Sequence, residues 1–166
     1  MPRTVIIACE MIEDEVQLAL EALAPEDRPP VVWVESRLHD RPELLKAALQ
    51  RLIDLLDEGS STGNTVSLPT VRPGIGAATE RSEEVQVGPV DEVLLALGFC
   101  GKGLQGLKAQ HLTLVFPRVD DCVSLLLNHG CAREDIPRDP RSYYMTRGWF
   151  VHNSSVTEAF QDWIER

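Results

Sequence analysis

Short apolar runs that alternate with segments of helical periodicity constrain the fold of this chain more than any other feature. The first run, TVIIA at 4–8, is rich in β-branched residues, as expected of a strand that is buried on both faces. Apolar residues then recur at helical spacing, and the same alternation returns further along the chain. We expect strands at 4–8, 31–35, 92–97 and 112–116, with a helix after each of them.

This order predicts an α/β fold of the doubly wound, Rossmann-like type. Strands that alternate with helices form a mostly parallel sheet with right-handed crossovers, here of at least four strands with helices on both faces. A chain of 166 residues is long enough for one full hydrophobic core, so we expect a single domain over 1–166. Ligands of such sheets bind outside the carboxyl ends of the strands.

The segment 59–89 interrupts the pattern. It is rich in Ser, Thr, Gly and Pro and has no apolar periodicity, so it would bury too little apolar surface to offset the entropy of ordering it. We expect a flexible insertion without packed structure. After the last expected strand, an aromatic-rich tail at 143–149 is followed by a predicted helix at 156–164.

Composition narrows the classes of function. A formal charge of −10 and the lack of any Lys/Arg-rich stretch argue against a nucleic-acid partner. No apolar run reaches membrane-spanning length, and the first apolar run is too short for a signal peptide. We therefore expect a cytoplasmic protein that binds no membrane. In that reducing compartment, thiols, metal ligands or catalytic groups explain the four cysteines better than disulfides do.

Three cysteines and a histidine follow the predicted strands. Cys9 ends the first strand, Cys100 comes directly after the third, Cys122 follows the fourth, and His39 lies in the loop after the second. Because the carboxyl ends of parallel strands share one edge, we predict that the four residues form one metal site. Thiolate and imidazole are good ligands for zinc, and thiolates also hold iron or an iron–sulfur cluster. The alternative is that the cysteines only pack as small buried hydrophobic residues.

Three residues are candidates for catalysis. Cys122 is expected in the first turn of a helix, where the helix dipole lowers the pKa of a thiol, so it is a candidate nucleophile. Asp121, like its neighbour Asp120, is a candidate base or metal ligand, although capping a helix is the more common use of Asp. His39 is a candidate acid or base, or a cap of the next helix. Cys131 follows a glycine in a charged loop and is left out of the site. The remaining histidines are expected to be surface or structural residues: His111, His129 and His152.

A glycine pattern offers a second function. Gly101, Gly103 and Gly106 match GxGxxG after a predicted strand, and Asp120 or Asp121 follows about twenty residues later, as a dinucleotide-binding fingerprint requires. Amides of such a loop hold phosphate or carboxylate groups, so the pattern indicates a nucleotide- or S-adenosylmethionine-type binder. The alternative is a tight turn, for which glycines are equally suited.

Five segments of the chain also occur, in the same order, in a known family. They are Cys9 with Glu13-Asp14-Glu15, Leu38-His39-Asp40-Arg41-Pro42, Gly98-Phe99-Cys100-Gly101, Pro117-Arg118-Val119-Asp120-Asp121-Cys122 and Tyr143-Tyr144-Met145-Thr146-Arg147-Gly148-Trp149. In these segments the chain resembles the prokaryotic domain-of-unknown-function family sixteen-thirty-eight. It departs from the family pattern at Glu10, where glycine is usual, in the length of the 59–89 segment, and at its C-terminal end, where the family continues.

The resemblance implies an α/β fold with a pocket that bears cysteine and histidine. The resemblance also implies genes encoded beside corrinoid-dependent methyltransferase components, and hence a corrinoid or methyltransferase protein as partner. The sequence thus predicts a metal-binding protein that acts on a small-molecule substrate in corrinoid-linked methyl transfer or sulfur chemistry. A non-catalytic accessory module, which presents its aromatic tail to a methyltransferase, is a third hypothesis.

Overall fold

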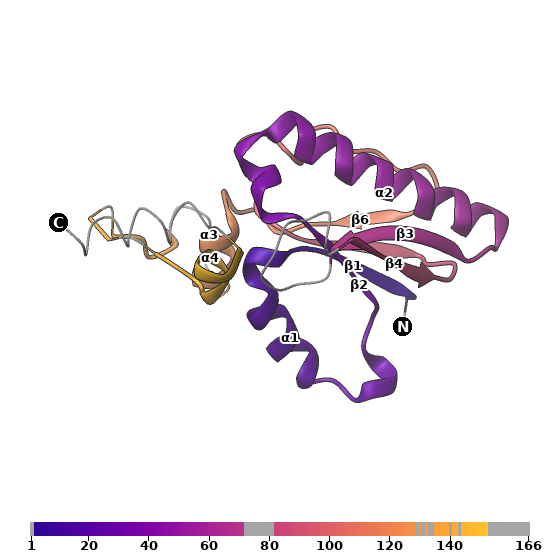
Figure 1. Cartoon of the computed structure of the whole chain (residues 1–166), viewed down its shortest axis with the longest axis horizontal. Coiled ribbons are helices and arrows are strands. Elements are labelled where there is room, and N and C mark those ends of the chain that lie inside the picture. Colours follow the sequence, from indigo (N-terminus) through magenta and orange to yellow (C-terminus); the bar gives the residue numbers. More distant parts are fainter. Residues whose placement is uncertain are drawn as a thin grey trace.

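The computed structural model describes residues 2–71, 82–128, 130, 132, 135–139, 141–142 and 144–152. They form an α/β fold around a parallel sheet with the strand order β2-β1-β5-β6 (Figure 1). The expected α/β class and all four expected strands are confirmed, with ends that differ by at most one residue. The strands of the sheet are β1 (Thr4–Cys9), β2 (Val31–Val34), β5 (Glu92–Ala96) and β6 (Thr113–Val115).

Two long helices flank the sheet, and two short ones lie together beyond one of its ends (Figure 1). The longest helix begins with a proline at its first position, which suits the fixed φ of that residue. It ends at Gly63, whose positive φ of 74° and N–H bond to the Gly59 carbonyl close the last turn. The helices are α1 (Glu13–Glu21), α2 (Pro42–Thr62), α3 (Cys122–Leu127) and α4 (Arg147–His152), with 3₁₀ turns η1 (Glu10–Ile12), η2 (Pro25–Asp27) and η3 (Ser36–Asp40).

β1 is the central strand, paired in parallel with β2 on one side and β5 on the other. Successive side chains of a strand point to opposite faces, and the two faces of β1 belong to separate core clusters. Val5 and Ile7 pack in the cluster that contains the apolar stripe of α2, whereas Ile6 and Ala8 pack with Leu20 of α1. The two long helices therefore cover opposite faces of the sheet.

The segment 59–89 contains packed structure, so the expectation of an insertion without it is wrong. β3 (Val66–Val71) and β4 (Ser82–Val87) pair antiparallel, and Leu68 and Val87 are buried in the core. Thr70 Oγ1 accepts a hydrogen bond from the N–H of Trp33 at 2.7 Å, which fixes the hairpin beside β2. The composition is polar because one face of the hairpin is exposed, as is common in antiparallel pairs. Residues 72–81 lie outside the described residues.

The connection from β5 to β6 consists of turns and extended chain, and the predicted helix there is wrong. Turns at 100–106 lead into a segment that runs along α2. Gln50 of α2 makes two hydrogen bonds to the main chain of Lys108, and Asp57 accepts the N–H groups of residues 110–112. Because α2 satisfies these main-chain groups, no helix is needed there. The predicted helix after β6 is present as α3, whereas the one expected at 156–164 lies outside the described residues.

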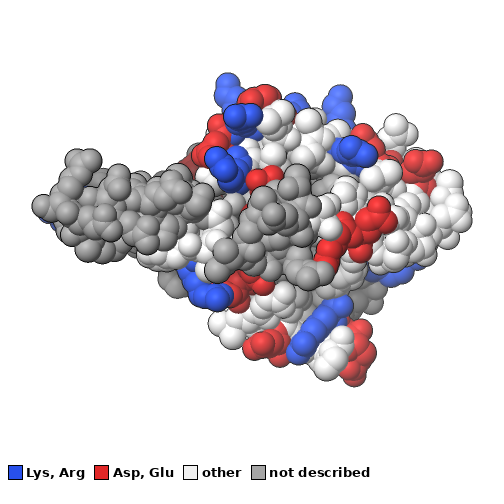
Figure 2. Space-filling view, in the orientation of Figure 1, with Lys and Arg blue, Asp and Glu red and all other residues white. Residues whose placement is uncertain are grey.

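Basic and acidic side chains are interspersed over the described surface that Figure 2 shows. Among the helices of the described residues, none combines the length and the apolar character needed to cross a membrane.

Candidate functional site

The site forms where the turn after β5 packs against the start of α3. Gly98, after β5, lies so near the main chain of Asp121 that a Cβ atom would overlap it. Next to it, the Phe99 N–H donates to the Val119 carbonyl at 2.9 Å and the Cys100 N–H to the Asp120 carbonyl at 2.8 Å. These bonds place the turn after β5 beside the start of α3.

Cys100 occupies an unusual backbone conformation at this point. Its φ is +42°, in the left-handed region that glycine adopts easily and other residues seldom enter. Such a conformation in a non-glycine residue costs about 1 kcal/mol and persists where the surroundings impose it. The thiol of Cys100 is therefore held at the sheet edge by the paired segments on both sides of it.

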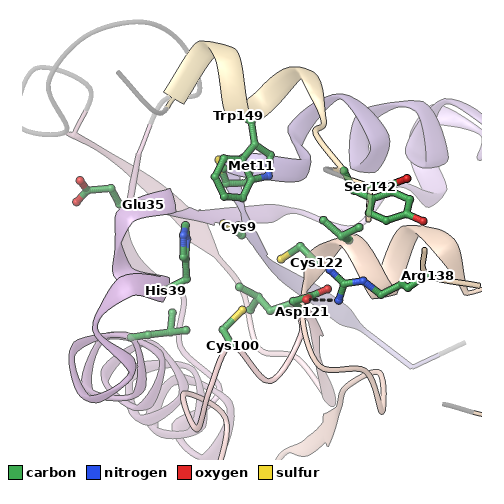
Figure 3. Close-up of a pocket in the computed structure, with 14 residues that line it drawn as sticks. Cys9, Met11, Glu35, His39, Cys100, Asp121, Cys122, Arg138, Ser142 and Trp149 are labelled. Carbon is green, nitrogen blue, oxygen red and sulfur yellow. Dashed lines mark hydrogen bonds and ion pairs between the residues drawn. The ribbon is translucent and has the colours of Figure 1, made fainter. Parts of the chain in front are cut away.

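The three predicted cysteines come together at the carboxyl end of β1. The thiol of Cys122 interacts with those of both Cys9 and Cys100, and Figure 3 shows the three side chains at the same pocket. All three are free thiols. The prediction that residues after three different strands converge is therefore confirmed for the cysteines.

The interaction of the thiols favours ionisation of one of them over the other two. The neighbouring thiols of Cys100 and Cys9 lower the pKa of Cys122 well below its usual value, against the effect of its burial. The same interactions, together with burial, raise the pKa of Cys9 and of Cys100. Cys122 is thus the thiol of the cluster that ionises most readily, as expected for a candidate nucleophile.

A cavity of about 290 Å³ adjoins the thiols, and the sulfur-bearing residues line it together with His39 and Asp121. Its walls are largely apolar and include Leu97. Figure 3 shows two further apolar residues of the wall, Met11 and Trp149. Binding sites for small ligands are typically concave and apolar with a few polar groups, and this cavity lies at the small end of their size range. The cavity therefore suits a small molecule.

His39 lies in η3, and its contacts fit both interpretations of its position, a local partner of Asp40 and a residue of the site. Its Nε2 is 3.3 Å from Asp40 Oδ1, the local partner that a capping histidine would have. It also lines the cavity, where its ring lies 6.1 Å from that of Trp149, and its charge contributes to the lowered pKa of Cys122. His39 thus belongs to the site as a group that approaches the thiols from the opposite wall.

Asp121 caps α3 and forms an ion pair. Its Oδ1 accepts the Ser124 N–H at 2.7 Å, and its Oδ2 lies 2.7 Å from Arg138 Nη1. Burial opposes ionisation of this carboxyl, but the bonds from Ser124 and Arg138 outweigh it and lower the pKa of Asp121. Capping, the more common use of Asp, is therefore observed. The neighbouring Asp120 is exposed and contributes its main-chain carbonyl to the bond with Cys100.

Comparison with known proteins places the sequence in a family. The family described as "Protein of unknown function (DUF1638)" matches residues 77–166, which is more than half of the chain. The chain belongs to the DUF1638 family. No curated protein and no solved structure matches it. The resemblance found in the sequence is confirmed, and the DUF1638 match includes Cys100 and Cys122 but neither Cys9 nor His39.

The glycine pattern of this DUF1638 chain contacts α2. A Cβ atom at Gly103 would lie 2.6 Å from Cδ2 of Leu45, and one at Gly101 would lie 3.0 Å from Cγ of Pro42. At Gly106 the nearest atom is Nζ of Lys46, at 3.2 Å. These glycines allow the turn to pack closely on the helix, and the cavity is lined by other residues. Their contacts favour the tight-turn interpretation.

A buried polar cluster beside the thiols was missed by the sequence analysis. Glu10 follows Cys9 and is fully buried; its Oε1 accepts the Ser36 N–H at 2.9 Å. The His152 side chain is 1% exposed, with Nδ1 3.6 Å from Glu10 Oε2 and Nε2 3.6 Å from Glu13 Oε2. Burial raises the pKa of Glu13, although His152 opposes the effect. A surface position, one of the two expected for His152, is therefore wrong, because its side chain is buried beside Glu10 and Glu13.

The thiol cluster as it stands is not a coordination sphere. Among the side chains that the structure describes, no group of three or more His, Cys, Asp or Glu residues is arranged to hold a metal ion. The thiol of Cys122 instead interacts with those of Cys9 and Cys100. His129 and Cys131 lie outside the described residues.

Proposed function

We propose that this DUF1638 protein binds a metal, either zinc or iron including an iron–sulfur cluster, through Cys9, Cys100 and Cys122. The observation that carries the proposal is the contact of the Cys122 thiol with two thiols that come from other segments of the chain. Thiols from three segments gather beside a cavity, and a sulfur-rich donor set of this kind suits zinc and iron.

The donor set fits such a metal by its chemistry. Metal binding requires deprotonated thiols, so a bound ion would replace the present interactions among the thiols. The side chains would have to turn toward the ion, since they do not surround a common point as they stand. His39 is the fourth ligand in this proposal, or an acid or base, because its contact with Asp40 occupies Nε2 and leaves Nδ1 for the metal or a proton.

A metal at this position would act as a Lewis acid or, as a cluster, leave an iron open to a substrate. The protein's own residues would orient that substrate: Met11 and Trp149 form apolar walls, and Arg138 lines the cavity beside Asp121. A small molecule is the substrate class that the cavity volume supports.

The wider setting of the proposal comes from the sequence. We place the protein in the cytoplasm, without a nucleic-acid or membrane partner, and in corrinoid-linked methyl transfer or sulfur chemistry with a corrinoid or methyltransferase protein. A doubly wound, Rossmann-like topology fits the strand order and the helices on two faces. The second candidate, a nucleotide- or S-adenosylmethionine-type binder, has less support because Gly101, Gly103 and Gly106 pack against α2. No contact of the described residues favours the accessory module over these two.

Elemental analysis of protein purified without oxygen tests the proposal. We expect stoichiometric zinc or iron in the wild type and its loss in Cys100→Ser and in Cys122→Ser, because a hydroxyl is a much poorer ligand than a thiolate. Circular dichroism should show an intact fold, since the core is formed mainly by the sheet with α1 and α2. Cys131→Ser is the control and should keep the metal. Wild-type protein that carries no metal and takes up neither zinc nor iron would refute the proposal.

A further inference from the structure

The three thiols that could bind a metal also have the arrangement needed for disulfide exchange. A disulfide forms when two sulfur atoms lie near each other and a co-reactant can reach one of them. Cys122 meets the first condition twice, since its thiol contacts those of Cys9 and Cys100. The cavity meets the second condition, because all three cysteines line it.

We propose that Cys100 and Cys122 form a reversible disulfide by exchange with a small disulfide such as oxidised glutathione. The thiolate of one cysteine attacks the small disulfide, which forms a protein–glutathione bond and releases one glutathione thiolate. The second cysteine loses its proton and attacks the protein sulfur of that bond, which releases the second glutathione. The protein dithiol is oxidised, and the small disulfide is reduced to two thiols.

Position favours Cys100 over Cys9 as the partner of Cys122. Cys9 ends the central strand, is 4% exposed and accepts a hydrogen bond from the Met11 main chain. Cys100 is half-buried and lies on a turn that no ladder of the sheet includes. Bond formation therefore disturbs less structure at Cys100 than at Cys9.

The remaining thiol, Cys9, can exchange with the Cys100–Cys122 disulfide. Cys9 stays next to Cys122, so its thiolate can attack the Cys122 sulfur, release Cys100 and form a second disulfide. The exchange conserves electrons, because one disulfide breaks as the other forms. This activity goes beyond metal binding, and the two states exclude each other because they use the same sulfur atoms.

Peptide mapping by mass spectrometry tests the inference. The full chain, freed of metal by a chelator, is treated with oxidised glutathione, quenched with acid and digested without reductant. We expect a peptide that joins Cys100 to Cys122, without retained glutathione, in the wild type and in the Cys131→Ser control. Cys122→Ser should instead retain glutathione on Cys100, because the remaining thiol of the cavity, Cys9, is buried at the end of β1 and interacts mainly with Cys122. A stable glutathione adduct in the wild type, or a disulfide between another pair at first oxidation, would overturn the inference.

Two further comparisons keep the test decisive. If Cys122→Ser fails to fold by circular dichroism, Cys9→Ser takes its place; it must still form the Cys100–Cys122 peptide, and loss of that peptide from the folded variant counts against the inference. The metal content of the untreated protein separates the two proposals. Protein without metal that still forms the disulfide refutes metal binding alone, and protein with metal whose chelated form yields no disulfide refutes the exchange alone.

Discussion

Gly148 of α4 lies against the main-chain carbonyl of Met11, with no space between them for a Cβ atom. Thr146 Oγ1 donates to the same carbonyl at 2.7 Å, and Arg147 lies 2.9 Å from Asp14. The three contacts attach α4 to η1 and α1, beside the carboxyl end of β1. They also bring Trp149 to the cavity wall.

Gly148→Ala should therefore detach α4 from η1. The added methyl group would overlap the Met11 carbonyl, and overpacking of this kind costs about 1–3 kcal/mol. In a background with Trp33→Phe and Trp163→Phe, Trp149 fluorescence should shift to the red as the ring becomes exposed. Gly88→Ala is the control, because nothing lies within 4 Å of its new Cβ atom. An unchanged spectrum in Gly148→Ala would contradict this account of α4.

Leu68→Ala should show that the β3–β4 hairpin belongs to the core. The side chain is fully buried, and truncation of a buried leucine costs about 3 kcal/mol through lost burial and the cavity that remains. Urea unfolding followed by circular dichroism measures the free energy of unfolding. Leu18→Ala, at a position that is 69% exposed, should change it by less than about 0.5 kcal/mol. Equally small effects of both changes would show that the hairpin contributes little to the core.

Asp121 should stabilise α3 in two separable ways. Asp121→Ala removes the helix cap and the ion pair with Arg138, and loss of a cap alone costs about 1 kcal/mol. Asp121→Asn keeps an oxygen for the Ser124 N–H and loses only the charge, so its loss of stability should be smaller. Unfolding free energies of the two variants against the wild type measure the difference.

The same carboxylate makes stability depend on pH. The folded pKa of Asp121 is lowered, so its contribution is present above the unfolded pKa, about 4, and is lost as pH falls through the lower folded pKa. The stability of the wild type should decline more steeply below about pH 4 than that of Asp121→Asn. Parallel acid unfolding curves would show that the ion pair with Arg138 adds nothing.

Glu10→Ala should destabilise the protein, because Glu10 is buried and its side chain contacts other buried polar groups. It removes the buried acceptor of the Ser36 N–H and leaves His152 without its neighbouring carboxylate, at a cost of about 3 kcal/mol. Glu10→Gln keeps an acceptor for Ser36 and should lose less. Urea unfolding checks both, with the exposed Glu26→Ala as control. A loss in Glu10→Ala no larger than that of the control would show that the buried contacts carry little stability.

The sequence predicted the site because strand geometry determines where its thiols lie. Cys9 and Cys100 follow neighbouring parallel strands, so knowledge of the strand ends was sufficient to bring them to one edge. The turns after β5 were mistaken for a helix because their hydrogen-bond partners, Gln50 and Asp57, come from α2. Local sequence carries no signal of such tertiary partners.

Two other features, the β3–β4 hairpin and the contact of Glu10 with His152, could be predicted only in part from the sequence. The alternation of Val66 and Leu68, with Val85 and Val87 opposite them, is the pattern of a half-buried hairpin, but it is hidden within a polar composition. Glu10 and His152 are far apart in the sequence, and no periodicity connects them. The one available signal in the sequence was a glutamate directly after the cysteine that ends an apolar strand.

The central place of β1 has a consequence for how the DUF1638 match is used experimentally. The matched residues, 77–166, include β5 and β6 but not the strand that pairs with the other edge of β5. Cut at the family boundary, a recombinant fragment would expose that edge of β5 to unintended pairing between copies and would lack Cys9. Biochemical work on this protein therefore requires the N-terminal residues that the family boundary leaves out.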